Sequence, residues 1–184
     1  MTVLAQFDRL LPPGLQLPGA LRPARHLALL AAITGASVPL LMLLYHWLGF
    51  DAAAVAVMMA GTAMVAAPLL LRVGLPFTYA CNVFISSLFV LKIWLAVHLG
   101  GLASATTAWF VLCPLVAALL GGARPALVWS ALVCKVYAVL FLWGRFVGPF
   151  LPYPVVAPDV LAFVGQLGLL VLASVVALCF CSDD

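Results

Sequence analysis

Ionisable side chains are scarce in this chain, and the few that lie far from its loops are the residues best able to carry chemistry. The chain of 184 residues has eight Lys and Arg residues, five acidic residues that are all Asp, and three His residues. Among them, Lys135 stands inside a long apolar stretch, and the polar but uncharged Gln166 stands inside another. Because a charge in an apolar medium is costly, such a lysine indicates a functional role in binding or in relaying a signal.

The sequence lacks the known catalytic motifs. The chain contains no Gly-x-Ser-x-Gly, no His-Glu-x-x-His and no Gly-x-x-x-x-Gly-Lys. The three histidines are spread over the N-terminus and two apolar stretches, which disfavours a bis-histidine haem site. Cys179 and Cys181 form a pair without further ligands nearby. We therefore predict no enzyme activity, no metal and no cofactor in these residues.

The elements that position these side chains are apolar helices. Hydrophobic residues make up 67% of the chain, charged residues 7%, and the mean hydropathy is +1.30, whereas a soluble domain carries about 25% charged residues. A membrane-spanning helix needs about 20 apolar residues, and continuous apolar runs exclude the alternating pattern of a β-barrel. We predict an all-α bundle of six transmembrane helices near 27–49, 53–71, 77–97, 105–121, 126–147 and 159–181.

These six stretches repeat as three similar helical hairpins. The first helix of each hairpin closes with a tryptophan at nearly equal spacing, namely Trp47, Trp94 and Trp143. Pro68 and Pro114 recur in the second helices of the first two hairpins. A turn containing Gly and Arg then precedes a proline that opens the next helix, a position where proline loses no hydrogen bond. The pattern predicts three hairpins that all run in the same direction.

The distribution of charge predicts the orientation of the bundle in the membrane and the division of the chain into segments. Positive residues gather at the N-terminus and in the second and fourth loops, and only one lies in the opposite loops: Arg9, Arg22, Arg25, Arg72 and Arg124 against Arg145. Since positive residues stay on the cytoplasmic side, both termini are predicted to be cytoplasmic. We expect a cytoplasmic segment over 1–25 with a surface helix, a membrane domain over 26–181 and a short end over 182–184. The net charge of +3 does not indicate nucleic-acid binding.

Depth along the helices orders the candidate residues. Lys135 precedes Trp143 by about 12 Å, and Gln166 lies about 10 Å into the last helix from Asp159, at 1.5 Å per residue. The half-thickness of the hydrocarbon is about 15 Å, so we expect both near the midplane and in contact with each other. Lys92 is only about 3 Å from the level of Trp94 and is expected to extend to the outer headgroups.

Polar and aromatic residues concentrate in the predicted outer half. The candidates for sensing a ligand or signal are Lys135, Gln166, Lys92, His46, Trp94, Trp109, Tyr137 and Asp159. A ligand cleft that opens outward has this composition, and so does an ordinary aromatic belt at a membrane interface. Both interpretations stay open from the sequence.

Several segments together resemble a known class of membrane regions. They are Trp47, Ala67-Pro68-Leu-Leu-Leu-Arg72, Ala105-Thr-Thr-Ala-Trp109-Phe-Val-Leu-Cys-Pro114, Gly121-Gly122 and Arg124-Pro125 followed by Trp129. Over residues 25–181 the chain resembles the six-helix sensor regions of bacterial histidine kinases, hybrid kinases and class III adenylyl cyclases. The resemblance implies a bacterial inner-membrane protein that forms homodimers and passes a signal through its last helix to a cytoplasmic output domain or partner.

Two other classes compete with this interpretation. Small six-helix substrate-capture subunits of vitamin transporters have about this length, and the outer aromatic residues are compatible with them. An accessory subunit of a larger membrane complex is the third class, because the sequence ends at Asp184 without a kinase or cyclase domain. We expect either an isolated sensor fragment or a free-standing relative that needs a partner.

Overall fold

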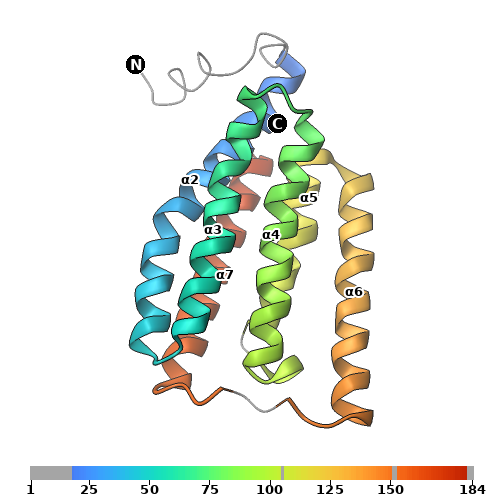
Figure 1. Cartoon of the computed structure of the whole chain (residues 1–184). Coiled ribbons are helices and arrows are strands. Elements are labelled where there is room, and N and C mark those ends of the chain that lie inside the picture. The colour runs from blue at the N-terminus through green and yellow to red at the C-terminus, as the bar shows by residue number, and fades with distance from the viewer. Residues whose placement is uncertain (1–17, 105, 151–152, 182–184) are drawn as a thin grey trace.

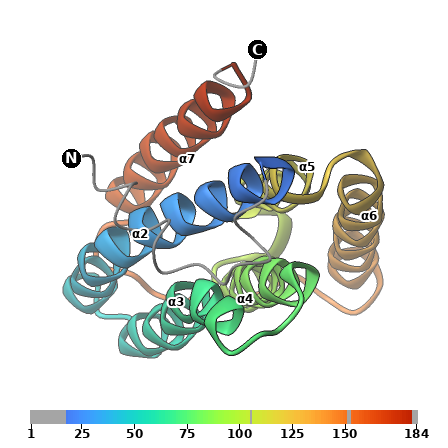
Figure 2. The same cartoon turned by 90° about the horizontal axis from the view of Figure 1, so that it is seen from above.

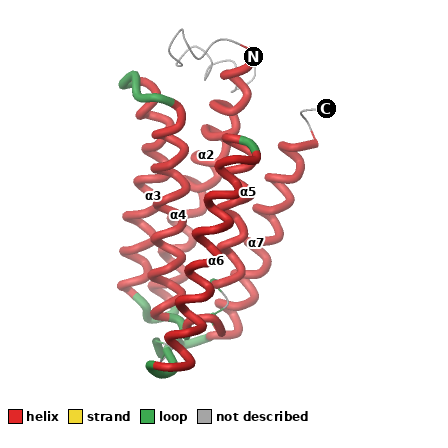
Figure 3. Tube along the Cα trace, turned by 90° about the vertical axis from the view of Figure 1, so that its right-hand side faces the viewer, coloured by secondary structure: helices red, strands yellow, loops and turns green. Residues whose placement is uncertain are grey.

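The structure is an up-and-down bundle of α-helices (Figure 1), described in a computed structural model for residues 18–104, 106–150 and 153–181. The helices are α2 (Pro18–Trp47), α3 (Asp51–Arg72), α4 (Phe77–His98), α5 (Leu112–Gly121), α6 (Ala123–Phe146) and α7 (Pro158–Cys181). Two short 3-10 helices, η2 (Gly101–Ala103) and η3 (Thr107–Val111), lie between α4 and α5. Loops connect the helices at the two ends of the bundle, and the described residues contain no strand (Figure 3).

The prediction of an all-α fold with six α-helices is confirmed, but the prediction of six membrane spans is not. Within the described residues, four helices are long and apolar enough to cross a membrane: Arg22–Trp47, Asp51–Arg72, Phe77–His98 and Ala123–Phe146. The apolar helices Thr107–Gly121 and Pro158–Ser174 are shorter. These four helices indicate a membrane protein.

The shortness of the fourth predicted span has a local cause. Gly100 and Gly101 both have positive φ angles, a conformation that glycine adopts without strain, and the chain turns into η2 directly after α4. The α-helix proper begins only at Leu112. Pro114 therefore lies in the first turn of α5, where its missing N–H costs no hydrogen bond, and not near the far end of the helix as the hairpin pattern suggested.

The start and end of the chain differ from the predicted boundaries or lie beyond them. Helix α2 begins at Pro18, before the predicted start of the membrane domain at residue 26. The predicted surface helix falls mostly on residues 1–17, which lie outside the described residues, as does the predicted end over 182–184.

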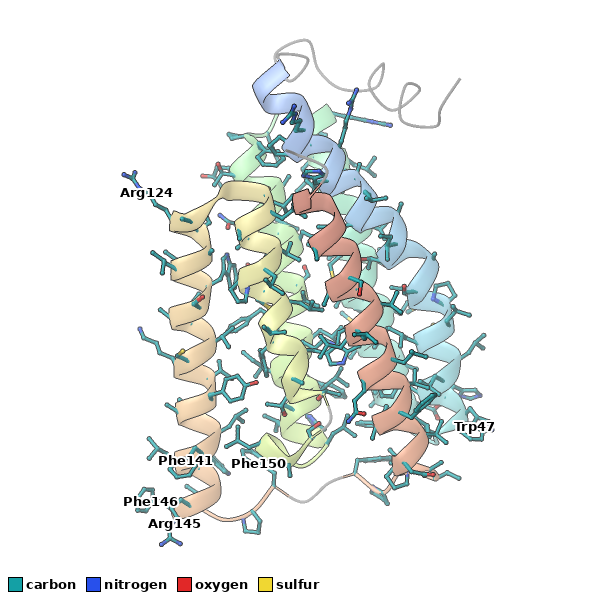
Figure 4. The ribbon with its side chains drawn as sticks, turned by 180° about the vertical axis from the view of Figure 1, so that it is seen from behind. Trp47, Arg124, Phe141, Arg145, Phe146 and Phe150 are labelled. Atoms are coloured by element: carbon teal, nitrogen blue, oxygen red, sulfur yellow. The ribbon has the colours of Figure 1, made fainter. Side chains whose placement is uncertain are left out.

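The two ends of the bundle have different compositions. Trp47, at the end of α2, and Arg145, near the end of α6, lie at one end, and Arg124 lies at the other (Figure 4). The beginning of α2 and the end of α7 lie at the same end as Arg124 (Figure 1). We call the end with Trp47 and Arg145 the tryptophan end and the opposite one, with Arg72 and Arg124, the arginine end.

The three predicted hairpins do not pack alike. In the first hairpin α2 packs along α3, whereas in the second α4 packs less closely on α5. Helix α5 packs closely along α6, the first helix of the third hairpin, and Gly122, with a φ angle of 79°, allows the one-residue turn between them. Helix α7 instead packs against α5, and the view from above places it apart from α6, on the other side of α2 (Figure 2). The third hairpin is therefore open, and its packing does not repeat that of the first.

Apolar side chains both fill the bundle and cover its outside. A large buried cluster joins α2, α3, α4, α5 and α6, and a second one lies near the tryptophan end around Leu48, Phe50 and Leu95. Helices α6 and α7 leave large hydrophobic side chains exposed: Leu127, Val128, Val139, Phe141, Leu142, Trp143, Phe146, Phe163, Leu167, Leu170 and Val171. Apolar surface of this extent in a soluble monomer is rare, whereas it is expected against lipid.

Candidate functional site around Lys92

Lys92 is the one charged residue among the described residues that is buried. It lies on α4 and is 7% exposed, and its ammonium nitrogen lies 4.2 Å from the ring centroid of Trp109. A cation over the face of an indole is stabilised by about 2 kcal/mol when both groups are desolvated. The expectation that Lys92 extends to the outer headgroups was wrong, because the ring of Trp109 holds its charged end inside the bundle.

The segment between α4 and α5 carries Trp109 and is held by its own hydrogen bonds. The hydroxyl oxygens of Ser104 and Thr106 are 2.8 Å apart, and the Thr107 hydroxyl donates to the carbonyl oxygen of Gly101 at 2.9 Å. Ser104, Thr106 and Thr107 are buried, and their local hydrogen bonds satisfy the polar groups that a non-helical backbone leaves open. This internal bonding fixes η3 and with it Trp109.

Tyr137 ties the same segment to α6. Its hydroxyl donates to the carbonyl oxygen of Thr107 at 2.9 Å. Its ring packs edge-on against the fully buried Phe110, with the two ring centroids 5.8 Å apart. Phe110 in turn packs edge-on against Phe89 of α4, with the ring centroids 5.9 Å apart. The aromatic side chains thus clamp η3 between α4 and α6, so that Trp109 has little freedom to move alone.

Trp109 also forms the contact surface for α7. A Cβ atom built on Gly168 would lie 3.1 Å from two ring carbons of Trp109, and one on Gly165 would lie 3.8 Å from its indole nitrogen. The absence of side chains at these two positions lets α7 approach the indole closely. One ring therefore contacts the buried cation of α4 and the backbone of the last helix.

Lys135 and Gln166 are not brought together. Both side chains are exposed, on α6 and α7 respectively, and no hydrogen bond joins them in the described part of the chain. The two helices that carry them lie apart (Figure 2). The predicted contact was wrong, because equal depth along two helices brings side chains together only where the helices are adjacent.

The candidates at the tryptophan end form a second cluster, held by the loop before α7. Phe50 stacks on Tyr153 with ring centroids 4.1 Å apart, and Trp94 stacks on His98 at 4.1 Å. The backbone of Tyr153 donates to the carbonyl oxygen of His98 at 2.8 Å. The loop is thereby fixed across the ends of α3 and α4.

His46 and Asp159 lie at the surface of this end. His46 contacts Asp51 through Nδ1 at 2.6 Å, and both side chains are about three-quarters exposed, at 73% and 75%. Asp159 is exposed in the first turn of α7, where a negative charge suits the helix dipole. Neither residue contacts Lys92. The predicted candidates therefore divide among the interior site around Lys92, the tryptophan end, and the exposed Lys135 and Gln166, which belong to neither.

The described residues form no metal centre, and comparisons with known proteins find no relative. Among the described residues no group of three or more His, Cys, Asp or Glu side chains could hold a metal ion. Comparison with protein-family profiles, with curated proteins and with solved structures finds no match to this chain. The resemblance to sensor regions therefore rests only on the residues that carry it.

Proposed function

We propose that this chain is the membrane sensor or anchor region of a transmembrane signalling system. In this proposal it lies in a bacterial cytoplasmic membrane, with both termini and the arginine end facing the cytoplasm. A signal received within the bundle or at the tryptophan end alters α7, which acts on a cytoplasmic output domain or a partner protein.

The contact of Trp109 with both Lys92 and α7 carries this proposal. A lysine in a membrane interior costs about 3 kcal/mol, so its placement is sensitive to any change in hydration or contacts around it. Trp109 is the only described ring that the ammonium contacts, and Gly165 and Gly168 place α7 against the same ring. A change at Lys92 that moves the indole must therefore move or loosen α7.

The weak packing of α7 supports its role as the moving element. Among the helices it packs mainly on α5, and much of its outer face is exposed. Elements that move in signalling are drawn from the less stable parts of a fold. The exposed faces of α6 and α7 also provide apolar surface for a homodimer or another membrane partner in the proposed assembly.

The proposal can be tested by measuring a distance that reports the position of α7. Spin labels are placed on the purified chain at Ser174 and Val73, which are exposed on α7 and after α3. Cys134, Cys179 and Cys181 are first replaced by Ser. Lys92→Met, which removes the buried charge, is expected to shift or broaden the distance distribution measured by pulsed electron paramagnetic resonance.

Lys135→Met is the matched control, because it removes an exposed lysine from a helix that does not pack on α7. An unchanged distribution in Lys92→Met, or an equal change in both variants, contradicts the proposal.

Mass spectrometry of the detergent-purified protein separates the competing classes. A homodimer supports the sensor, whereas a bound vitamin or a co-purified large complex indicates a transporter subunit or an accessory subunit.

A further inference from the structure

An apolar groove runs along the outside of the bundle between α2 and α3. Two adjoining cavities, of about 380 Å³ and 230 Å³, share the wall residues Gly35, Val65 and Leu69, so they form one continuous groove. Ligand sites have volumes of about 300–1,000 Å³. The Thr62 hydroxyl in the wall donates its one proton to the Met58 carbonyl oxygen within α3.

The length of the groove matches one leaflet of a membrane. Along α3 its wall extends from Gly61 and Thr62 to Arg72, which is about 15 Å at 1.5 Å per residue. The half-thickness of the hydrocarbon core is also about 15 Å. The groove therefore reaches from the level of the midplane to the level of the headgroups at the arginine end.

A positive charge marks the headgroup end of this groove. Arg72 is the last residue of α3, lines the second cavity and is exposed. It makes no ion pair or side-chain hydrogen bond with any other described residue. A guanidinium in this position can donate two parallel hydrogen bonds to a phosphate, while the groove beside it offers only apolar contacts to a chain.

We infer that this groove binds an anionic phospholipid, with one acyl chain between α2 and α3 and the headgroup phosphate at Arg72. The length and the charge select a lipid from the leaflet at the arginine end. The inference does not depend on the signalling proposal, because it requires neither Lys92 nor a movement of α7.

Native mass spectrometry of the full chain in detergent tests this site. The protein is titrated with phosphatidylglycerol and, separately, with phosphatidylcholine of the same acyl chains, and the retained lipid is counted. We expect phosphatidylglycerol to be retained preferentially. Arg72→Gln should reduce its apparent affinity about five-fold, the effect of one basic residue near an anionic headgroup, and should leave phosphatidylcholine nearly unchanged.

Arg124→Gln is the matched control, since Arg124 is an exposed arginine at the same end of the bundle but not beside the groove. Ala66→Phe fills the groove from α3, and Ala32→Phe fills it from α2, so that one of them serves if the other fails to fold. Each should reduce retention of both lipids. Equal losses in Arg72→Gln and Arg124→Gln overturn the inference, as does full retention in a folded groove-filling variant.

Discussion

At the scale of single residues, the two lysines of the chain have opposite surroundings. Lys135 is exposed, while Lys92 is buried against Trp109. Lys92 stands in a row of buried residues on α4 with Ile85, Leu88 and Leu95. This three-to-four-residue spacing defines one face of a helix, and the structure shows that this face of α4 points into the bundle.

Replacing Lys92 by Met should leave the free energy of unfolding unchanged within about 1 kcal/mol or raise it, because a well-packed apolar side chain can replace a buried charge without loss. Lys92→Ala should instead lower it by about 2–4 kcal/mol through the cavity that it leaves. Denaturation in detergent, followed by circular dichroism, gives both values. A loss for Met as large as that for Ala would show that the charge itself stabilises the fold.

At the scale of the elements, glycines determine how closely two pairs of helices approach. Gly61 of α3 lies directly against the side chain of Val38 on α2, where an added Cβ atom would collide. Gly168 of α7 lies against Trp109 with slightly more room. In lipid, where apolar surface gives no drive to associate, close packing through small residues is the main source of helix association.

Gly61→Ala should lower the free energy of unfolding by about 1–3 kcal/mol, the usual cost of an overpacked contact. The branched side chain of Val38 has little freedom to turn aside. Val38→Ala in the same protein should restore much of the loss, because it removes the colliding atoms. Melting temperatures of the two single variants and the double variant measure this coupling, and simple additivity of the two effects would refute the close contact.

Gly168→Ala should be less stable than Gly165→Ala by about 1 kcal/mol, since only the first places a methyl group too close to the indole of Trp109. The two substitutions are chemically identical and lie one turn apart on α7, so their helix propensities cancel. Thermal unfolding of both variants in the same detergent provides the comparison. Equal stabilities would mean that α7 does not rest on Trp109.

At the scale of the whole molecule, both ends of the helical chain lie together at the arginine end (Figure 1). Arg72 and Arg124 are exposed there, whereas Arg145 is at the tryptophan end. Six antiparallel helices make the shared location of the ends a geometric necessity. Which side of a membrane the arginine end faces follows from the charge bias and not from the packing.

We predict that a fluorescent protein fused after Asp184 folds and fluoresces in the cytoplasm. A periplasm-dependent phosphatase inserted in the 99–100 turn of the tryptophan end should be active. Cell fluorescence reports the first fusion and phosphatase activity the second. A phosphatase fused after Gly74, at the arginine end, is the control that should be inactive. Activity at Gly74 and none at the tryptophan end would reverse the proposed orientation.

The sequence by itself determined the all-α fold and the approximate places of its six helices, because apolar length, turn glycines and helix-opening prolines act locally. It thereby placed the helix-ending Trp47, Trp94 and Trp143 at one end and most arginines at the other. Only the tertiary structure decided which helices are neighbours and which face of each one is buried. In a helix that is apolar all round, the lipid-facing and core-facing sides look alike in sequence. For that reason Lys135 and Gln166 could be assigned a shared level but not a contact, and the meeting of Lys92, Trp109 and Gly168 emerged only from the packing of α4, η3 and α7.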